Sequence, residues 1–475
     1  MSKQELNRRA FLRNSGALTV AGMATPWFIN LSMMAEAAAA SAAPGDDYKA
    51  LVCVFLQGGN DHANTLIPFD PVSHEAYAKA RGLRETGGLA IPLAELTATQ
   101  LAPTLDRTMA LAPALAPLKP LFDNQRMAVL LNIGPVVRPT SLDDFKAGKG
   151  ALPPKLFSHN DQQSVWLSSM PEGSVLGWGG VIGEDQLPAL PDSGKRPPRD
   201  YLTNVNLASN NVFLAGQSAG QYMVNANGIA PLKALSGAHF GSSSKFAAAF
   251  KTLVTTENPL AHRMAKEHAN IMRRAIDTNE VLLGAMSGLQ IKPLSTADAN
   301  AKPLAAQLNM VARLIEANQQ LGLKRQVFYV ALGGFDNHDR LTADHPRLLA
   351  QLAQALSQFD KDLDTLNMAD KVTTFTASDF GRTMSSNGDG SDHGWGSYHF
   401  VMGGAVNGGR YYGDLPAVTG GATDIGQGRL LPTMAVDQLS VALAGWMGVA
   451  PSRFDLLAPN WQKFSATTLS GLLKK

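Results

Sequence analysis

The sequence is almost free of cysteine. Cys53 stands alone among 475 residues, inside an apolar run. A single cysteine forms no intramolecular disulfide, and it supplies neither a zinc nor an iron–sulfur site built on several thiolates. A lone cysteine among apolar neighbours is usually a small buried hydrophobe, and we predict this for Cys53. The fold must therefore rest on its core, and any metal must be held by other side chains.

Charged side chains are scarce as well. They make up 17% of the residues, whereas globular proteins have about 25%. With 45% hydrophobic residues, the chain can bury a large core in one big domain or two smaller ones, and we expect no disorder over most of its length. The net charge is +2 and no lysine or arginine block follows the N-terminus. Bulk electrostatics therefore gives no sign of a nucleic-acid partner.

The N-terminus carries a targeting pattern. The pair Arg8-Arg9 is followed by Phe-Leu, then by a mildly apolar stretch over 17–34 and by small residues that suit cleavage. This resembles a bacterial twin-arginine signal, so we predict that residues 1–37 are removed on export. The expected partner is the twin-arginine export machinery, and the expected location is the periplasm or beyond. A retained membrane anchor is the alternative, but the stretch is too polar for a good spanning helix. No membrane span is expected after the signal.

Short apolar runs that end in polar or glycine clusters recur along the chain. Such continuous runs are typical of buried parallel strands. They cover residues 49–56, 126–131, 326–332 and 371–377. Helical patterns lie between them, at 246–284, 304–321, 346–366 and 433–447, with a weaker one at 115–122. This alternation predicts an α/β layered fold with a mostly parallel central sheet flanked by helices. The irregular region 185–240 reads as an insertion or an edge subdomain.

Carboxylates and imidazoles follow the predicted strands. Asp61, Asp336, His338 and Asp379 each stand just past a strand, and His393 lies in a glycine-rich loop beside Asp392. Ligands of open α/β sheets bind at the carboxyl ends of the strands, so we expect these side chains to converge. Such ligands suit a divalent metal. A turn that caps the next helix is the alternative for Asp61.

Other residues nearby allow two interpretations. Ser158 opens a predicted helix over 162–170, where it suits either an N-cap paired with Asp161 or a hydroxyl nucleophile beside His159. Arg382 could bind a substrate anion or pair with Asp379. His399 we interpret as a buried, hydrogen-bonded imidazole. Asp339 and His345 compete as ligands beside Asp336 and His338.

One motif points to a different chemistry. Residues 216–220 read Gly-Gln-Ser-Ala-Gly, which matches the nucleophile elbow of serine hydrolases. The elbow needs a strand before Ser218 and a helix after it, but Tyr222 to Gly228 read as strand or turn. The order Ser218, Asp336, His393 is permissible for such an enzyme, so a serine hydrolase stays as an alternative.

Several motifs recur together in one family. They are the twin-arginine start, Phe55–Asp61, Gly334–His338, Ser378–Thr383, Asp392–Gly394, Leu431–Thr433 and Asp437-Gln438. In this order they resemble the bacterial domain-of-unknown-function family numbered 1501, from about Ala50 to the C-terminus. That family is grouped with the alkaline phosphatase/sulfatase-like superfamily, whose members use one or two divalent metals at strand ends.

The resemblance implies an alkaline phosphatase-like fold, with residues 48–475 as a single domain. It also implies one or two divalent ions (Zn, Mn or Ca), held by Asp61, Asp336, His338, Asp379 and His393. Two departures stand out: Phe380 occupies the place of a superfamily histidine, and Asp379 stands where Glu is commoner. No sulfatase-type Cys/Ser-x-Pro-x-Arg nucleophile motif is present.

These observations predict an exported, metal-dependent hydrolase of a small anionic phosphate or sulfate ester. Ser158 and Arg382 are the catalytic candidates. A non-catalytic metal-binding or assembly protein on the same fold is a second hypothesis, because membership of a family carries a fold more safely than an activity. The serine hydrolase centred on Ser218 is the third.

Overall fold

The computed structural model describes residues 47–102, 107–188, 196–229, 244–256 and 262–474. The predicted signal, residues 1–37, lies outside the described residues. From Tyr48 onward the chain forms one compact unit. Within the described residues, no helix is both long and apolar enough to cross a membrane.

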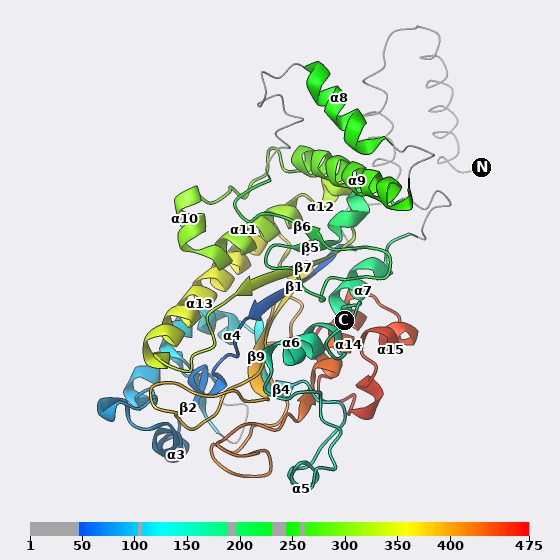
Figure 1. Cartoon of the computed structure of the whole chain (residues 1–475). Coiled ribbons are helices and arrows are strands. Elements are labelled where there is room, and N and C mark those ends of the chain that lie inside the picture. The colour runs from blue at the N-terminus through cyan, green and yellow to red at the C-terminus, as the bar shows by residue number, and fades with distance from the viewer. Residues whose placement is uncertain (1–46, 103–106, 189–195, 230–243, 257–261, 475) are drawn as a thin grey trace, which may run out of the picture. The chain divides into compact units, whose positions relative to one another are not determined.

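A nine-stranded sheet runs through this unit, in the order β10-β4-β9-β8-β1-β7-β5-β6, with β11 beside β4 (Figure 1). All neighbouring pairs are parallel except those that β9 makes with β4 and β8. The strands are β1 (Lys49–Leu56), β4 (Met127–Gly134), β5 (Asn204–Asn206), β6 (Tyr222–Met223), β7 (Arg325–Leu332), β8 (Val372–Ser378), β9 (Ser397–Met402), β10 (Arg410–Tyr412) and β11 (Met434–Ala435). Strands β2 (Leu66–Pro68) and β3 (Met109–Leu111) form a separate antiparallel pair.

The prediction of an α/β fold with a mostly parallel central sheet is confirmed. The four apolar runs are strands β1, β4, β7 and β8, and nearly every residue in them is buried. Successive residues of β1 enter two different cores: Val52 and Val54 pack on one face, Cys53 and Phe55 on the other. Such alternation is what a strand covered on both faces requires.

Helices cover both faces of the sheet (Figure 1). Helices α11 (Pro303–Glu316) and α13 (Leu341–Thr365) contribute to the core that holds Val52. Helices α6 (His159–Ser168), α7 (Trp178–Asp185) and α14 (Val436–Met447) contribute to the core that holds Cys53. Cys53 is buried and free, as expected.

The remaining helices are shorter or peripheral. They are α3 (Pro71–Arg81), α4 (Lys119–Asp123), α5 (Leu142–Lys146), α8 (Ser244–Thr255), α9 (Arg263–Ala285), α10 (Thr296–Ala301), α12 (Asn318–Leu321) and α15 (Phe454–Leu457). Turns of 3₁₀ helix are η2 (His62–Asn64), η3 (Arg84–Thr86), η4 (Leu93–Thr99), η5 (Pro113–Leu118), η6 (Pro198–Leu202), η7 (Ala369–Lys371), η8 (Pro451–Arg453) and η9 (Trp461–Lys463).

Some boundaries differ from the predicted ones. The pattern over 246–284 is two helices, α8 and α9, and residues 257–261 between them lie outside the described part. The pattern at 115–122 is the 3₁₀ turn η5 followed by the short α4, because Pro117 and Pro120 interrupt a regular helix. From the region 185–240, strands β5 and β6 extend the sheet beyond β7. That this region is a separate subdomain stays a prediction.

Candidate metal centre

The carboxyl ends of three adjacent strands form the floor of the site. Strands β7, β1 and β8 are neighbours in the sheet, so the loops that follow them meet at one edge. The loops touch closely at Gly58, where a Cβ atom would lie 2.4 Å from the backbone nitrogen of Asp336. Gly58 also has a φ of +115°, which glycine adopts most readily. The glycine after β1 therefore lets the Asp336 loop come close.

Three imidazoles surround the carboxylate of Asp336. The Nε2 atoms of His338 and His393 each lie 3.2 Å from Asp336 Oδ1, and His159 Nε2 lies 3.5 Å from Asp336 Oδ2. The two Nε2 atoms of His338 and His393 are 2.8 Å apart. These side chains are partly exposed, with 45% of the Asp336 side chain and 23% of the His393 side chain accessible. The cluster is thus formed within the protein and open to solvent.

The other ring nitrogen of each histidine faces an oxygen acceptor. His159 Nδ1 lies 2.6 Å from Asp379 Oδ2, His338 Nδ1 lies 3.3 Å from Asp392 Oδ1, and His393 Nδ1 lies 2.8 Å from the Phe157 carbonyl oxygen. The tautomer with the hydrogen on Nδ1 satisfies each of these oxygens and turns the Nε2 lone pairs toward the cluster, which is the arrangement that a metal ligand needs.

This tautomer pattern calls for a cation. Two lone pairs 2.8 Å apart, on His338 and His393, repel each other unless a metal ion or a shared proton lies between them. The ligand atoms of His159, Asp336 and His393 all lie within 4.8 Å of one another. A tetrahedral ion with bonds of about 2.1 Å would hold its donors about 3.4 Å apart, close to the distances around Asp336. These residues therefore fit a divalent metal.

Arg382 holds the central carboxylate. Its side chain is fully buried, and its Nη1 donates to Asp336 Oδ1 at 2.9 Å and to the Gly58 carbonyl at 3.0 Å. Burial raises the pKa of Asp336, but the hydrogen bond and charge of Arg382 outweigh it and lower that pKa below its ordinary value. Of the two roles predicted for Arg382, the structure shows neither a free guanidinium nor a pair with Asp379.

Asp379 lies behind His159 and is fully buried. Its Oδ1 accepts from the Gly58 backbone N–H at 3.1 Å, and its Oδ2 accepts from Gln163 Nε2 at 2.9 Å in addition to His159. The hydrogen bond to Asp379 is the largest cause of a raised pKa at His159. Burial has the opposite effect on His393 and lowers its pKa. Asp379 thus orients an imidazole, and its oxygens are engaged by protein donors.

Asp61 is not brought to the cluster. Its buried carboxylate forms an ion pair with Arg81, and its Oδ1 accepts from the backbone N–H of Ala63 at 3.1 Å. Burial raises the pKa of Asp61, but the charge of Arg81 contributes most to an overall lowering. The contacts of Asp61 are those of the capping turn that the sequence offered as the alternative.

Family membership follows from a direct match. The model of the family described as "Protein of unknown function (DUF1501)" matches residues 48–433. The chain belongs to this family. The resemblance drawn from the ordered motifs is thereby confirmed. A comparison with curated proteins found no match to this DUF1501 chain.

Solved structures show distant similarity to this DUF1501 chain. The PsFucS1 sulfatase from Pseudoalteromonas sp. shares 8% identity and a TM-score of 0.37, with 95% of this chain and 78% of that chain covered. The lipoteichoic acid synthase LtaP from Listeria monocytogenes shares 9% identity and a TM-score of 0.33, covering 89% and 81%. A variant of the alkaline phosphatase PafA shares 11% and a TM-score of 0.27, covering 71% and 64%. Likenesses of this size say nothing of the reaction.

Ser158 stands at the N-cap position of helix α6, at the edge of the centre, but its side chain makes no capping hydrogen bond. Its hydroxyl donates to Asp161 Oδ2 at 2.8 Å, and its carbonyl accepts from the Gln162 backbone N–H at 3.0 Å. The residue before it, Phe157, has a φ of +71°, which is rare for a bulky side chain and often marks functional sites. This turn presents the Phe157 carbonyl to His393 at the start of the helix that carries His159.

The surroundings of Ser218 do not form a nucleophile elbow. Backbone N–H groups of residues 217–219 donate to the carboxylate of Glu184, and Arg196 donates to the Ser218 hydroxyl at 2.7 Å. The chain continues into strand β6 rather than a helix. Within the described residues, no histidine contacts Ser218. The motif here binds a carboxylate of the same chain.

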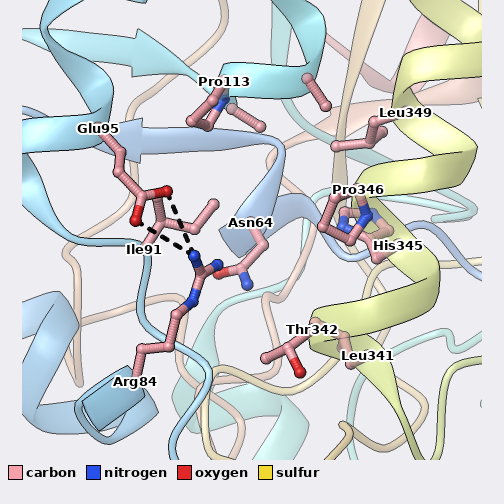
Figure 2. Close-up of a pocket in the computed structure, with 12 residues that line it drawn as sticks. Asn64, Arg84, Ile91, Glu95, Pro113, Leu341, Thr342, His345, Pro346 and Leu349 are labelled. Carbon is pink, nitrogen blue, oxygen red and sulfur yellow. Dashed lines mark hydrogen bonds and ion pairs between the residues drawn. The ribbon is translucent and has the colours of Figure 1, made fainter.

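Two further histidines belong to the interior. His399 is buried on β9 and its Nδ1 lies 3.2 Å from Thr376 Oγ1, as predicted. His345 lines a cavity of about 240 Å³ between the start of α13 and the turns η4 and η5. Figure 2 shows this cavity with the ion pair of Arg84 and Glu95 at one side. Its lining includes no residue of the metal centre.

His159 is the ligand candidate that strand-end reasoning underrated. The sequence analysis placed it only beside Ser158, because it opens a helix and follows no strand. A signal was present in the spacing of His159 and Gln163. One helical turn separates them, so both side chains can reach the same carboxylate, that of Asp379.

Proposed function

We propose that this chain is an exported, metal-dependent hydrolase of small anionic phosphate or sulfate esters. The observation that supports this most is the convergence of three imidazole Nε2 atoms on the carboxylate of Asp336. Export through the twin-arginine pathway belongs to the same proposal and rests on the N-terminal pattern around Arg8-Arg9.

The proposed ligands are His159, His338, His393 and Asp336. Three nitrogens and one oxygen favour Zn or Mn over Ca, which prefers oxygen donors. The geometry favours a single ion at this cluster. Asp61 is left out of this ligand set because Arg81 already neutralises it. When bound, such an ion polarises an ester oxygen and acidifies water.

The protein's own contribution is to orient the ligands and keep the site reachable. Arg382 fixes the Asp336 carboxylate, and Asp379 fixes the tautomer of His159. Asp336 and His338 are partly exposed, so solvent and a small ester can reach them. We propose water as the nucleophile, because the Ser158 hydroxyl is already engaged as a donor to the Asp161 carboxylate.

Metal content tests the proposal directly. The purified mature protein should contain about one Zn or Mn per chain, measured by inductively coupled plasma mass spectrometry, and Asp336→Ala should lose it. His268→Ala, which removes an exposed histidine on α9, is the matched control and should keep the metal. Wild-type protein that binds no divalent ion after incubation with Zn and Mn would contradict the proposal.

Turnover is measured on p-nitrophenyl phosphate, bis-p-nitrophenyl phosphate and p-nitrophenyl sulfate. At least one should be hydrolysed, and Asp336→Ala should reduce the rate to background. Metal without turnover on any ester would favour the non-catalytic metal-binding alternative. Ser158→Ala should retain activity within about tenfold, whereas a loss of about a thousandfold would identify Ser158 as a nucleophile. Labelling of Ser218 by a fluorophosphonate would favour the serine hydrolase.

A further inference from the structure

We infer that Arg429 binds the anionic group of the substrate, and that the site is matched to an ester carrying a single negative charge. A sulfate monoester and a phosphate diester share this chemistry. The inference rests on the proposed function and adds to it the residue and the substrate charge.

Every nitrogen of Arg382, the arginine that the sequence suggested for this role, is already engaged within the protein. Its Nη1 bonds to Asp336 and Gly58, its Nε bonds to Ser391 Oγ at 3.1 Å, and its Nη2 bonds to the Ser391 carbonyl. The side chain is also fully buried. A substrate anion that reaches the cluster from solvent therefore needs another cation.

Arg429 is held against two residues of the site. Its Nε donates to the carbonyl oxygen of His393 at 2.7 Å, and its guanidinium carbon lies 5.5 Å from the centre of the Phe157 ring. These contacts fix the side chain through its backbone-facing nitrogen and its flat face. Neither contact involves the terminal nitrogens Nη1 and Nη2, which form the outer edge of the guanidinium.

The outer edge of Arg429 has no partner among the described residues: neither terminal nitrogen makes a hydrogen bond or ion pair there. The side chain is only partly buried. A hydrogen bond from Asn387 is the main cause of the lowered pKa of Asp392, and the charge of Arg429 adds to it. The guanidinium thus lies within electrostatic range of the carboxylate that orients His338. A fork of free N–H donors beside a metal centre suits two oxygens of one anion.

The charged side chains around the site indicate how many negative charges the bound anion carries. Asp336, Asp379 and Asp392 carry three negative charges, and Arg382 and Arg429 carry two positive ones. With neutral imidazoles the site has one net negative charge, which a divalent ion turns into one net positive charge. A singly charged ester therefore leaves the complex neutral, and anions should bind only when the metal is present.

The test compares Arg429→Gln and Arg429→Lys with wild type, in the metal-loaded full mature chain. Methyl sulfate, a singly charged anion, is the binding probe, measured by isothermal titration calorimetry. Arg429→Gln should weaken methyl sulfate binding about 10- to 100-fold, the size expected for charged hydrogen bonds, and Arg429→Lys should recover part of it. Arg347→Ala, at an exposed arginine on α13, is the matched control and should leave binding unchanged.

Kinetics supply the second readout. With bis-p-nitrophenyl phosphate or p-nitrophenyl sulfate, Arg429→Gln should raise KM by a similar factor while kcat changes less. The neutral ester p-nitrophenyl acetate should show no such rise. Wild type should also prefer the singly charged esters over p-nitrophenyl phosphate in kcat/KM. A preference for the dianion, or equal methyl sulfate affinity in wild type and Arg429→Gln, would overturn the inference.

Failure of this inference differs from failure of the proposed function. If the chain binds metal and hydrolyses an ester but is indifferent to Arg429, only the inference falls. If no metal binds, the proposed function falls first, and methyl sulfate binding by the metal-free chain would then contradict the charge argument as well. Unchanged metal content in Arg429→Gln shows that the variant keeps an intact centre.

Discussion

Single residues set the orientation of each imidazole in the candidate centre. His159 relies on Asp379, His338 on Asp392 and His393 on a carbonyl oxygen. Partners of this kind fix the tautomer and raise the basicity of the ligating nitrogen. Arg382 performs the equivalent task for Asp336. The outer groups of the site are therefore as important to its chemistry as the proposed ligands.

Asp379→Asn tests this orienting role. The amide keeps the size of the side chain but is a poorer acceptor for His159 Nδ1, so metal affinity should fall about 10- to 100-fold. A competition titration against a chromogenic chelator measures it. Asp123→Asn, at a carboxylate paired only with Lys119 at the surface, is the control. Equal affinity in wild type and Asp379→Asn would show that His159 needs no second partner.

The sequence predicted some of these residues and not others, for identifiable reasons. Asp336, His338 and His393 were found because polar side chains past buried strands meet at one edge of the sheet. The pairing of Asp61 was not predictable, because Arg81 is brought to it by a helix that folds back after β2. Residues that meet in this way have no characteristic spacing in the sequence, so the ion pair could not be predicted from it. Arg382 was predicted to bind a substrate anion or to pair with Asp379, whereas it pairs with Asp336.

At the level of secondary structure, strands with continuous apolar sequences were predicted correctly, whereas a strand that mixes apolar and polar residues was not. Strands β1, β7 and β8 were predicted because both of their faces are buried. Strand β9 was missed, since its buried residues include Ser397 and His399, which do not read as core. It is also the antiparallel member of the sheet. A buried strand that contains polar side chains lacks a continuous apolar run, so it is not recognised from its sequence pattern.

The loop after β1 should tolerate no side chain at Gly58. In Gly58→Ala the methyl group would overlap the backbone of Asp336, at a positive φ that alanine avoids. We expect a loss of about 1–3 kcal/mol in unfolding free energy, together with weaker metal binding. Urea unfolding and metal titration measure the two effects.

Gly284→Ala on α9 is the matched control, because a methyl group there meets nothing within 4 Å. It should stabilise the protein by about 0.5–1 kcal/mol, since glycine is costly in a helix. If both alanine variants behaved alike, the close approach of the β1 and β7 loops would be refuted.

The buried His399 on strand β9 leads us to expect that the free energy of unfolding depends on pH. Burial lowers the pKa of His399 from 6.5 to about 3, so the folded state keeps this imidazole neutral. Below pH 6.5 the unfolded chain takes up the proton that the folded chain refuses. The stabilising contribution is thus complete above pH 6.5 and is lost progressively as pH falls towards 3.

The measurement is the midpoint of urea unfolding between pH 7.5 and 4.5. It should fall in wild type and fall less steeply in His399→Phe, whose ring keeps the contact with Trp166. The same slope in both proteins would contradict the assignment of a neutral, buried His399.

Across the whole molecule, the candidate centre ties distant parts of the chain together. His159 opens α6, Asp336 and His338 follow β7, and His393 lies beyond β8. An ion held by all four side chains binds only the folded state, so it stabilises the fold by mass action. Binding of the proposed ion would therefore contribute to the stability of the whole fold.

Removal of the metal should therefore lower the melting temperature. Dialysis against EDTA should reduce Tm by several degrees, and added Zn or Mn should restore it. In Asp336→Asn, which lacks the central carboxylate, EDTA should change Tm little. A wild-type Tm that ignores both EDTA and added metal would argue against a metal held by the folded chain.

The Phe157 carbonyl has a consequence for engineering the centre. Asp379 and Asp392 can be exchanged for other side chains, so the environments of His159 and His338 are adjustable one at a time. The acceptor of His393 belongs to the main chain, and no side-chain exchange removes it. A redesign of the centre for a different metal can therefore change the hydrogen-bond acceptors of His159 and His338 by mutation, but not the acceptor of His393.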